Sequence, residues 1–158
     1  MSEKPIFLDS TAKRLALVFG AGCAPVMPGT VGTLAAIPLY LLMTGVGPVA
    51  YLIITMMVIV IGVLASGRAA RELNVHDHPA IVIDEVAGYL VTMALVPFSW
   101  TALVLGFIAF RFFDIVKPWP ISWFDRKVPG GAGIMLDDII AGLFANLVLW
   151  LILTFGSI

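Results

Sequence analysis

The chain has 158 residues, of which 61% are hydrophobic and 12% charged, and its formal net charge is -1. An ordinary soluble domain carries about 25% charged residues, so this composition indicates a protein of the lipid bilayer, and without a basic excess it excludes a typical nucleic-acid-binding protein. The single cysteine, Cys23, excludes an intrachain disulfide and a cysteine-based zinc site, and we expect it to be a core residue. We predict one membrane-embedded domain over residues 1–158, with a polar N-terminal segment over residues 1–14.

The first half of the chain predicts a broken segment followed by a helical hairpin. Residues 15–30 are interrupted by glycine and proline, so we expect an interfacial or re-entrant segment there. Residues 31–67 are almost wholly apolar and are about twice as long as the roughly 20 residues that cross a bilayer as a helix. They predict two helices joined by a turn at residues 45–48, where glycine and proline cluster. A polar stretch over residues 68–79 follows.

The second half predicts another hairpin and a final helix. The hairpin covers residues 81–116 and turns at residues 97–100. Prolines then break the chain, an amphipathic link follows, and residues 129–133 read as a glycine-rich loop. The last helix is predicted over residues 136–155. The fold class is therefore all-α, an integral membrane bundle of about five hydrophobic helices.

The positive charges predict how this bundle lies in the membrane. When the five helices are threaded across a bilayer, the two uncharged turns and the C-terminus fall on one side, and every lysine and arginine falls on the other. Cytoplasmic loops are enriched in Lys and Arg, so we assign the charged side to the cytoplasm. The nine cations are Lys4, Lys13, Arg14, Arg68, Arg71, Arg111, Lys117, Arg126 and Lys127.

Ionisable residues inside the apolar runs predict a functional site. Asp84 and Glu85 lie one turn into the second hairpin, and Arg111 and Asp114 lie near its end. Such groups cost about 2.5 to 3.5 kcal/mol or more each at membrane depth unless they are paired, hydrated or metal-bound. Glu85 and Arg111 are about 18 and 21 Å of helix from the turn at Pro97, so we expect them at similar depth. An ion-paired structural network is the alternative interpretation.

Carboxylates from three helices favour a hard cation. Asp137 and Asp138 stand at the corresponding boundary of the last helix, although two acids can also simply complement a helix N-terminus. With one cysteine and two histidines in the chain, Mg²⁺ fits these oxygen ligands better than zinc does. The predicted metal ligands are Glu85, Asp114, Asp137 and Asp138, and Asp84 joins Glu85 and Asp114 among the predicted catalytic carboxylates.

Cations near these acids predict a phosphate-binding end of the site. Arg111 and Lys117 share a helix face with Asp114, and Arg126 follows in the amphipathic link. Arginine offers a planar fork to phosphate and lysine a point charge. Thr30 is predicted to cap the first long helix, and because a helix start can bind phosphate, Thr30 and Thr33 are further candidate contacts.

Two histidines flank Asp77 on the polar stretch. His76 or His78 is a candidate for protonating the leaving alkoxide, since histidine is the commonest proton donor near neutral pH. Loop packing, or an imidazole oriented by Asp77 with no catalytic role, is the alternative interpretation.

The assembled motifs resemble those of the phosphatidylglycerophosphatase A family, from about Phe19 onward. The resemblance rests on Pro28-Gly29-Thr30-Val31-Gly32-Thr33-Leu34, on His76-Asp77-His78 followed by Asp84-Glu85, and above all on the run from Phe110 to Gly142, FRFFDIVKPWPISWFDRKVPGGAGIMLDDIIAG. It implies a Mg²⁺-dependent phosphatase of the bacterial inner membrane that hydrolyses phosphatidylglycerophosphate to phosphatidylglycerol and inorganic phosphate in phospholipid biosynthesis. The resemblance does not imply which carboxylate binds metal and which activates water.

Other functions fit the residues less well. The Pro-Ser-Gly-His element of histidine-nucleophile lipid phosphatases is absent, and so is the Asp-Gly-Ala-Arg pattern of CDP-alcohol phosphatidyltransferases. The second hypothesis is a small transporter or ion channel, because intramembrane acids and broken helices also mark ion pathways. Against it, the acids gather at one face and the far-side turns lack charge. The oligomeric state does not follow from the sequence.

Overall fold

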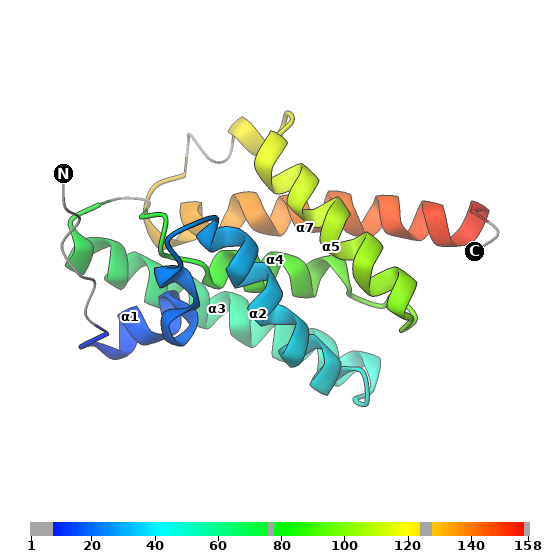
Figure 1. The fold of residues 1–158 in the computed structure, drawn as a ribbon, viewed down its shortest axis with the longest axis horizontal. Coiled ribbons are helices and arrows are strands. Elements are labelled where there is room, and N and C mark those ends of the chain that lie inside the picture. Colours follow the sequence, from blue (N-terminus) through cyan, green and yellow to red (C-terminus); the bar gives the residue numbers. More distant parts are fainter. Residues whose placement is uncertain (1–7, 76–77, 124–127, 157–158) are drawn as a thin grey trace.

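The computed structural model describes residues 8–75, 78–123 and 128–156, and all regular structure in these ranges is helical (Figure 1). This confirms the all-α prediction for the described residues. In chain order the elements are α1 (Thr11–Ala16), the 3₁₀ helix η1 (Val18–Cys23), α2 (Pro28–Met43), α3 (Pro48–Leu73), α4 (Ile83–Thr92), α5 (Trp100–Val116) and α7 (Gly130–Phe155).

Within the described ranges, two helices are long and apolar enough to cross a membrane, α3 and α7, with 26 residues each. The other hydrophobic runs form shorter helices of 16 residues in α2, 10 in α4 and 17 in α5. Both predicted turns are present, because α2 ends at Met43 before α3 begins at Pro48, and α4 and α5 are separated by the segment 93–99. At about 1.5 Å per residue, α4 is only about 15 Å long and does not span the hydrocarbon core.

Helix α4 is the centre of the fold, and nearly all its side chains are buried. It packs against α7, α2, α3 and α5. Gly88 permits close approach of both α5 and α7, because a Cβ there would lie 2.5 Å from the Phe110 ring and 2.7 Å from the Asp138 carbonyl oxygen. Where α4 ends, the Asn146 side chain on α7 donates to the carbonyls of Thr92 at 2.8 Å and Ala94 at 3.0 Å. These bonds satisfy backbone groups that the helix end leaves open.

The predicted glycine-rich loop over residues 129–133 is wrong, since α7 already begins at Gly130. Glycine serves packing here: a Cβ at Gly131 would collide with the Val63 carbonyl and would lie 3.0 Å from Cα of Gly67 on α3. Close contact between the two long helices therefore requires a residue without a side chain at this position.

Two other helix boundaries and the burial of one residue differ from the predictions. Helix α3 runs through the start of the polar stretch to Leu73, which places Arg68, Arg71 and Glu72 on a helix. Helix α2 begins at Pro28 with Met27 as its N-cap, so Thr30 is not the cap. Cys23 is exposed and is not a core residue. The broken segment over residues 15–30 is present as the end of α1, η1 and an irregular link.

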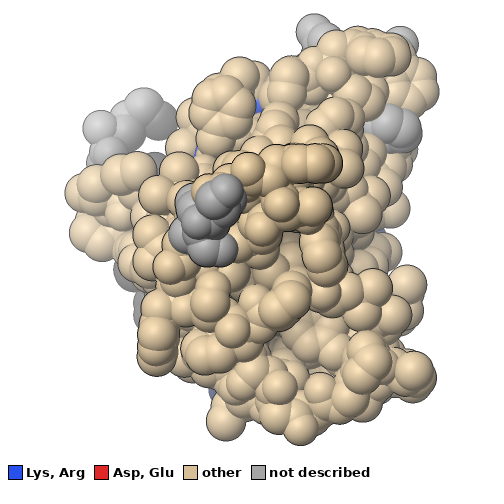
Figure 2. Space-filling model, turned by 90° about the vertical axis from the view of Figure 1, so that its right-hand side faces the viewer, with Lys and Arg blue, Asp and Glu red and all other residues tan. Residues whose placement is uncertain are grey.

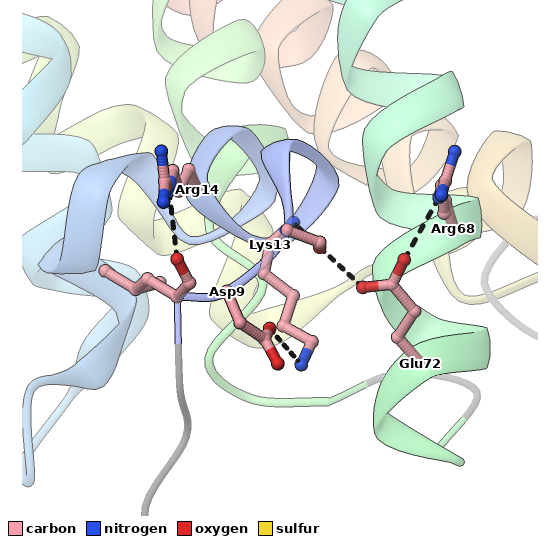
Figure 3. Close-up of polar contacts among 7 residues, drawn as sticks. Asp9, Lys13, Arg14, Arg68 and Glu72 are labelled. Atoms are coloured by element: carbon pink, nitrogen blue, oxygen red, sulfur yellow. Dashed lines mark hydrogen bonds and ion pairs between the residues drawn. The ribbon is translucent and has the colours of Figure 1, made fainter.

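Helix α1 is tied to the end of α3 by polar contacts (Figure 3). The Ser10 hydroxyl donates to the Glu72 carboxylate at 2.5 Å and accepts from the Lys13 backbone N–H at 3.1 Å, so one side chain both caps α1 and joins it to α3. Arg68 donates to the other Glu72 oxygen at 3.0 Å. On the exposed side, the Lys13 ammonium lies 2.7 Å from Asp9 and lowers the pKa of that carboxyl.

Residues 8–23 in turn fix the strap, which is the segment 78–82 that leads into α4. The Val82 backbone N–H donates to the Ala16 carbonyl at 2.9 Å. Gly22 lies against the Ala80 carbonyl so closely that a Cβ would collide with it. Ala16 and Leu17 are fully buried in an apolar cluster together with residues of α3, α4 and α7. The N-terminal residues thereby position the start of α4, which carries Asp84 and Glu85.

The two ends of the molecule differ in charge. Figure 2 shows the end where the α2–α3 and α4–α5 turns and the last residues of α7 lie, and almost no Lys, Arg, Asp or Glu is visible on it. The polar contacts of α1 and α3 lie at the opposite end.

Replacing Gly88 with alanine should destabilise the protein, because the added methyl group overlaps Phe110 and the α7 backbone. We expect a loss of about 1 to 3 kcal/mol, typical of overpacking, measured as a lower midpoint of thermal unfolding in detergent. Gly45→Ala is the matched control, since nothing lies within 4 Å of its Cβ position. Equal midpoints for the two variants would contradict the packing role of Gly88.

Candidate active site

A cavity of about 470 Å³ lies between the start of α2, the start of α4, the end of α5 and the start of α7. Its charged lining consists of five carboxylates and two cations, which are Asp84, Glu85, Asp114, Asp137, Asp138, Arg111 and Lys117. The structure thus brings these acids and cations, which come from three helices and were predicted to lie together, to one cavity. Their formal charges sum to an excess of negative charge, so the cavity as a whole favours a cation.

The floor of the cavity is a close group of acids. Asp84 and Glu85 lie in the first turn of α4, and Asp138 lies on α7, which packs against α4. One carboxylate oxygen from each of the three lies within 4.8 Å of the others. Asp84 and Asp138 are only 9% and 3% exposed. Carboxylates this close repel each other strongly in a poorly hydrated site unless a positive charge lies between them.

Two oxygens of this group lack a partner within the described part of the chain. Asp84 Oδ1 and Glu85 Oε2 are buried and accept no hydrogen bond from any described residue. A buried carboxylate oxygen without a donor is costly, and a bound cation removes that cost. The three carboxylates therefore fit a divalent metal ion with oxygen ligands, such as Mg²⁺.

Arg111 forms the wall next to this group. Its guanidinium is ion-paired with Asp114, one turn further along α5, and lies 3.9 Å from Glu85 on α4. The expectation that Glu85 and Arg111 reach the same depth is thus confirmed. Its Nε is buried and has no hydrogen-bond partner among the described residues, so Arg111 retains a donor for a ligand.

Gly29 brings the first turn of α2 against this pair. A Cβ at Gly29 would collide with the Glu85 carboxylate and would lie 3.1 Å from the Arg111 guanidinium. Only glycine leaves room for both groups at this position. The sequence reasoning missed this role, although a glycine in the first turn of a helix was a signal, because it costs helix propensity without serving a turn.

Lys117 and Asp137 close the other side of the cavity. The Lys117 ammonium lies 2.5 Å from an Asp137 oxygen, and Lys117 also ends α5 in a left-handed backbone conformation. Asp114 and Asp137, both predicted as metal ligands, are therefore ion-paired with cations. Asp84, predicted only as catalytic, instead belongs to the group of three acids with Glu85 and Asp138.

The remaining predicted residues lie elsewhere or outside the described ranges. Thr33 is fully buried and its hydroxyl donates to the Gly29 carbonyl at 2.9 Å, and neither it nor Thr30 lines the cavity. His78 accepts from the Ala80 N–H at 3.1 Å, which supports the strap before α4, and it does not line the cavity either. His76 and Arg126 lie outside the described residues.

Comparison with known proteins gives consistent matches. Residues 14–153 match the family model described as phosphatidylglycerophosphatase A. A protein of that name from Escherichia coli is 46% identical over 139 residues, covering 87% of this chain and 81% of the relative. A protein of the same name from Haemophilus influenzae is 38% identical over 151 residues, covering 94% and 93%.

A third relative carries a different name. This Bacteroides thetaiotaomicron protein, provisionally named a phosphatidylinositol-3-phosphatase, is 32% identical over 134 residues, covering 80% of this chain and 84% of the relative. No solved structure gives a significant match. The family match and the first two relatives confirm the resemblance drawn from the motifs, and the chain belongs to the phosphatidylglycerophosphatase A family.

Proposed function

We propose that the protein is an integral membrane phosphatase that hydrolyses phosphatidylglycerophosphate to phosphatidylglycerol and inorganic phosphate in phospholipid biosynthesis. The observation that carries this proposal is the cavity in which a group of buried acids adjoins an arginine and a lysine, in a chain of this family. The transporter hypothesis is not favoured, since the two relatives with the highest identity given above are both named as phosphatases of this lipid.

The substrate and the helices favour a multi-pass placement in the bacterial inner membrane. Helices α3 and α7 are each long enough to span it, and α2 and α5 would complete the bundle around the buried α4. The uncharged end of Figure 2 would cross to the far side, and the cavity would face the cytoplasm, where the positive charges belong.

We propose Mg²⁺ as the cofactor, held by Asp84, Glu85 and Asp138. The support is their mutual distance and the two oxygens without a described donor. Bound there, Mg²⁺ would offset the negative charge of the phosphate and help to orient the hydrolytic water. Glu85 also faces Arg111, so it would hold the cation and the arginine next to each other.

The two cations of the cavity would bind the phosphate. Asp114 holds the Arg111 guanidinium at a fixed orientation, which leaves the Nε edge available for a phosphate oxygen. Lys117 would add a point charge at the rim from its position beside Asp137. Since the groups are oriented before the substrate arrives, little reorganisation is needed as charge builds on the phosphate oxygens. His76 as proton donor and Arg126 as a third phosphate contact remain predictions.

Asp84→Asn, Glu85→Gln and Asp138→Asn should each lower Mg²⁺-dependent phosphate release by about 100-fold or more, because each amide keeps the shape and removes a ligand charge. Mg²⁺ should also raise the unfolding midpoint of the parent, because the ion binds only the folded state, and it should not raise the midpoint of these variants. Asp9→Asn is the control, as its carboxylate is exposed, is ion-paired with Lys13 and does not line the cavity. Variants with near-parental activity and the same Mg²⁺ stabilisation would show that the metal lies elsewhere.

Arg111→Lys should lose more activity than its unchanged charge suggests, because lysine lacks the planar fork that contacts phosphate and Asp114 together. We expect a loss of about 2.7 to 4 kcal/mol in kcat/KM, the size seen when one oriented donor is deleted. Lys117→Arg, the reciprocal exchange, should be milder. A lower kcat would show that Arg111 acts on the transition state, and a higher KM with unchanged kcat would show that it contributes to substrate affinity. Unchanged kinetics would leave Arg111 with only a structural role.

Cysteine labelling tests the proposed orientation. In a Cys23→Ser background, a cysteine at Ser99, before α5, should react only from the periplasmic side. A cysteine at Ser122, beyond the end of α5, should react only from the cytoplasm. The reverse pattern would invert the orientation and place the cavity on the periplasmic side.

A further inference from the structure

Two exposed apolar side chains belong to the lining of the charged cavity. Met27, at the corner before α2, is 59% exposed, and Ile115, near the end of α5, is 64% exposed. They come from different helices and lie at the edges of a cavity whose floor is formed by buried acids. The exposed part of the lining therefore includes apolar side chains, whereas the acids lie in its buried part.

These two edges are held by different parts of the bundle. Helix α2 packs mainly against α4 and η1, whereas α5 packs mainly against α7, and Figure 1 shows α2 in front of α4 and α5 in front of α7. The cavity lies where the start of α2 and the end of α5 both reach the acids of α4. Its edge is thus on the flank of the bundle, between two helices that both belong to apolar runs.

The backbone at Met27 holds this edge in an unusual conformation. Met27 has φ 52° and ψ 54°, a left-handed conformation that side chains other than glycine, asparagine and aspartate rarely adopt. Its carbonyl nevertheless accepts from the N–H groups of Thr30 at 3.0 Å and Val31 at 3.2 Å and so begins α2. Strained residues persist where the surrounding structure determines them, often at ligand sites.

The apolar edge continues beyond the cavity on both sides. Val26 precedes Met27, and Val116 and Trp119 follow Ile115, and all three are exposed. On these two edges, no described residue from Val26 to Met27 or from Ile115 to Val116 carries a charge. Lys117 lies between Val116 and Trp119, so this edge combines one cation with exposed apolar side chains, which matches the phosphate and acyl parts of a phospholipid.

We propose that Met27 and Ile115 form a side entrance that contacts the acyl chains of the phospholipid while its phosphate reaches Arg111 and the acids. The proposal rests on the proposed function and adds the residues that distinguish a lipid monoester from a soluble one. The substrate remains in the bilayer, and only its headgroup enters the charged part of the cavity.

The test compares a lipid with its own headgroup. The KM for phosphatidylglycerophosphate is measured in mixed micelles, and the deacylated headgroup, glycerophosphoglycerophosphate, is used as an inhibitor of the same reaction. The variants are Met27→Asn, because asparagine tolerates the left-handed conformation, and Ile115→Gln, because glutamine suits a helix. Leu147→Gln is the control, being 58% exposed on α7 and absent from the cavity lining.

Met27→Asn and Ile115→Gln should each raise the lipid KM by about tenfold, the equivalent of one buried apolar side chain, and leave the inhibition constant of the headgroup unchanged. Leu147→Gln should change neither. The proposed entrance would be overturned by an unchanged lipid KM or by a parallel rise of the lipid KM and the headgroup inhibition constant. It would also be overturned if these variants changed the oligomeric state in detergent, since the edge would then be covered by a second copy. A parent that releases no phosphate from the lipid would instead refute the proposed function.

Discussion

Mutual repulsion among buried carboxylates is the constraint on which the rest of this structure depends. Asp84, Glu85 and Asp138 are brought within a few ångströms of each other at the end of an apolar helix bundle, where water solvates them poorly. Such an arrangement is unfavourable without positive charge between or beside the acids. Arg111 and Lys117 supply part of that charge, and each is ion-paired with a further aspartate that fixes its position.

Glycine at the helix contacts makes this concentration of charge feasible. Gly29 lets α2 approach Glu85 and Arg111, Gly88 lets α7 and Phe110 approach α4, and Gly131 lets α7 approach α3. In a membrane, close packing and hydrogen bonds rather than the hydrophobic effect hold helices together, so small residues at contacts contribute directly to stability. Gly29 and Gly88 lie at contacts made by Glu85 on α4 and by the Asp138 backbone on α7, and these helices carry the three acids.

The helical class, the turn positions and the set of charged residues in the cavity could be predicted from the sequence, because apolar run length and buried charge are local signals. Which carboxylates group together and which pair with a lysine or an arginine could not be predicted in full. Asp114 follows Arg111 at the spacing of one helical turn, and their ion pair was foreseeable, but the contact of Lys117 with Asp137 depends on how α5 and α7 cross. For the same reason, the burial of Thr33 followed from tertiary packing, whereas the contact of His78 with the Ala80 N–H, two residues further on, is local.

The position of Asp138 on the last helix has a consequence for biogenesis. Helix α7 packs against α3, α4 and α5, and it follows all three of them in the chain. Until it inserts, Asp84 and Glu85 have no third carboxylate and α4 lacks its most extensive neighbour. Domains generally fold as the chain emerges, N-terminal part first, but the group of three acids forms only after α7 has emerged and packed against α4. A nascent chain in which α7 has not yet emerged therefore lacks the complete group of acids.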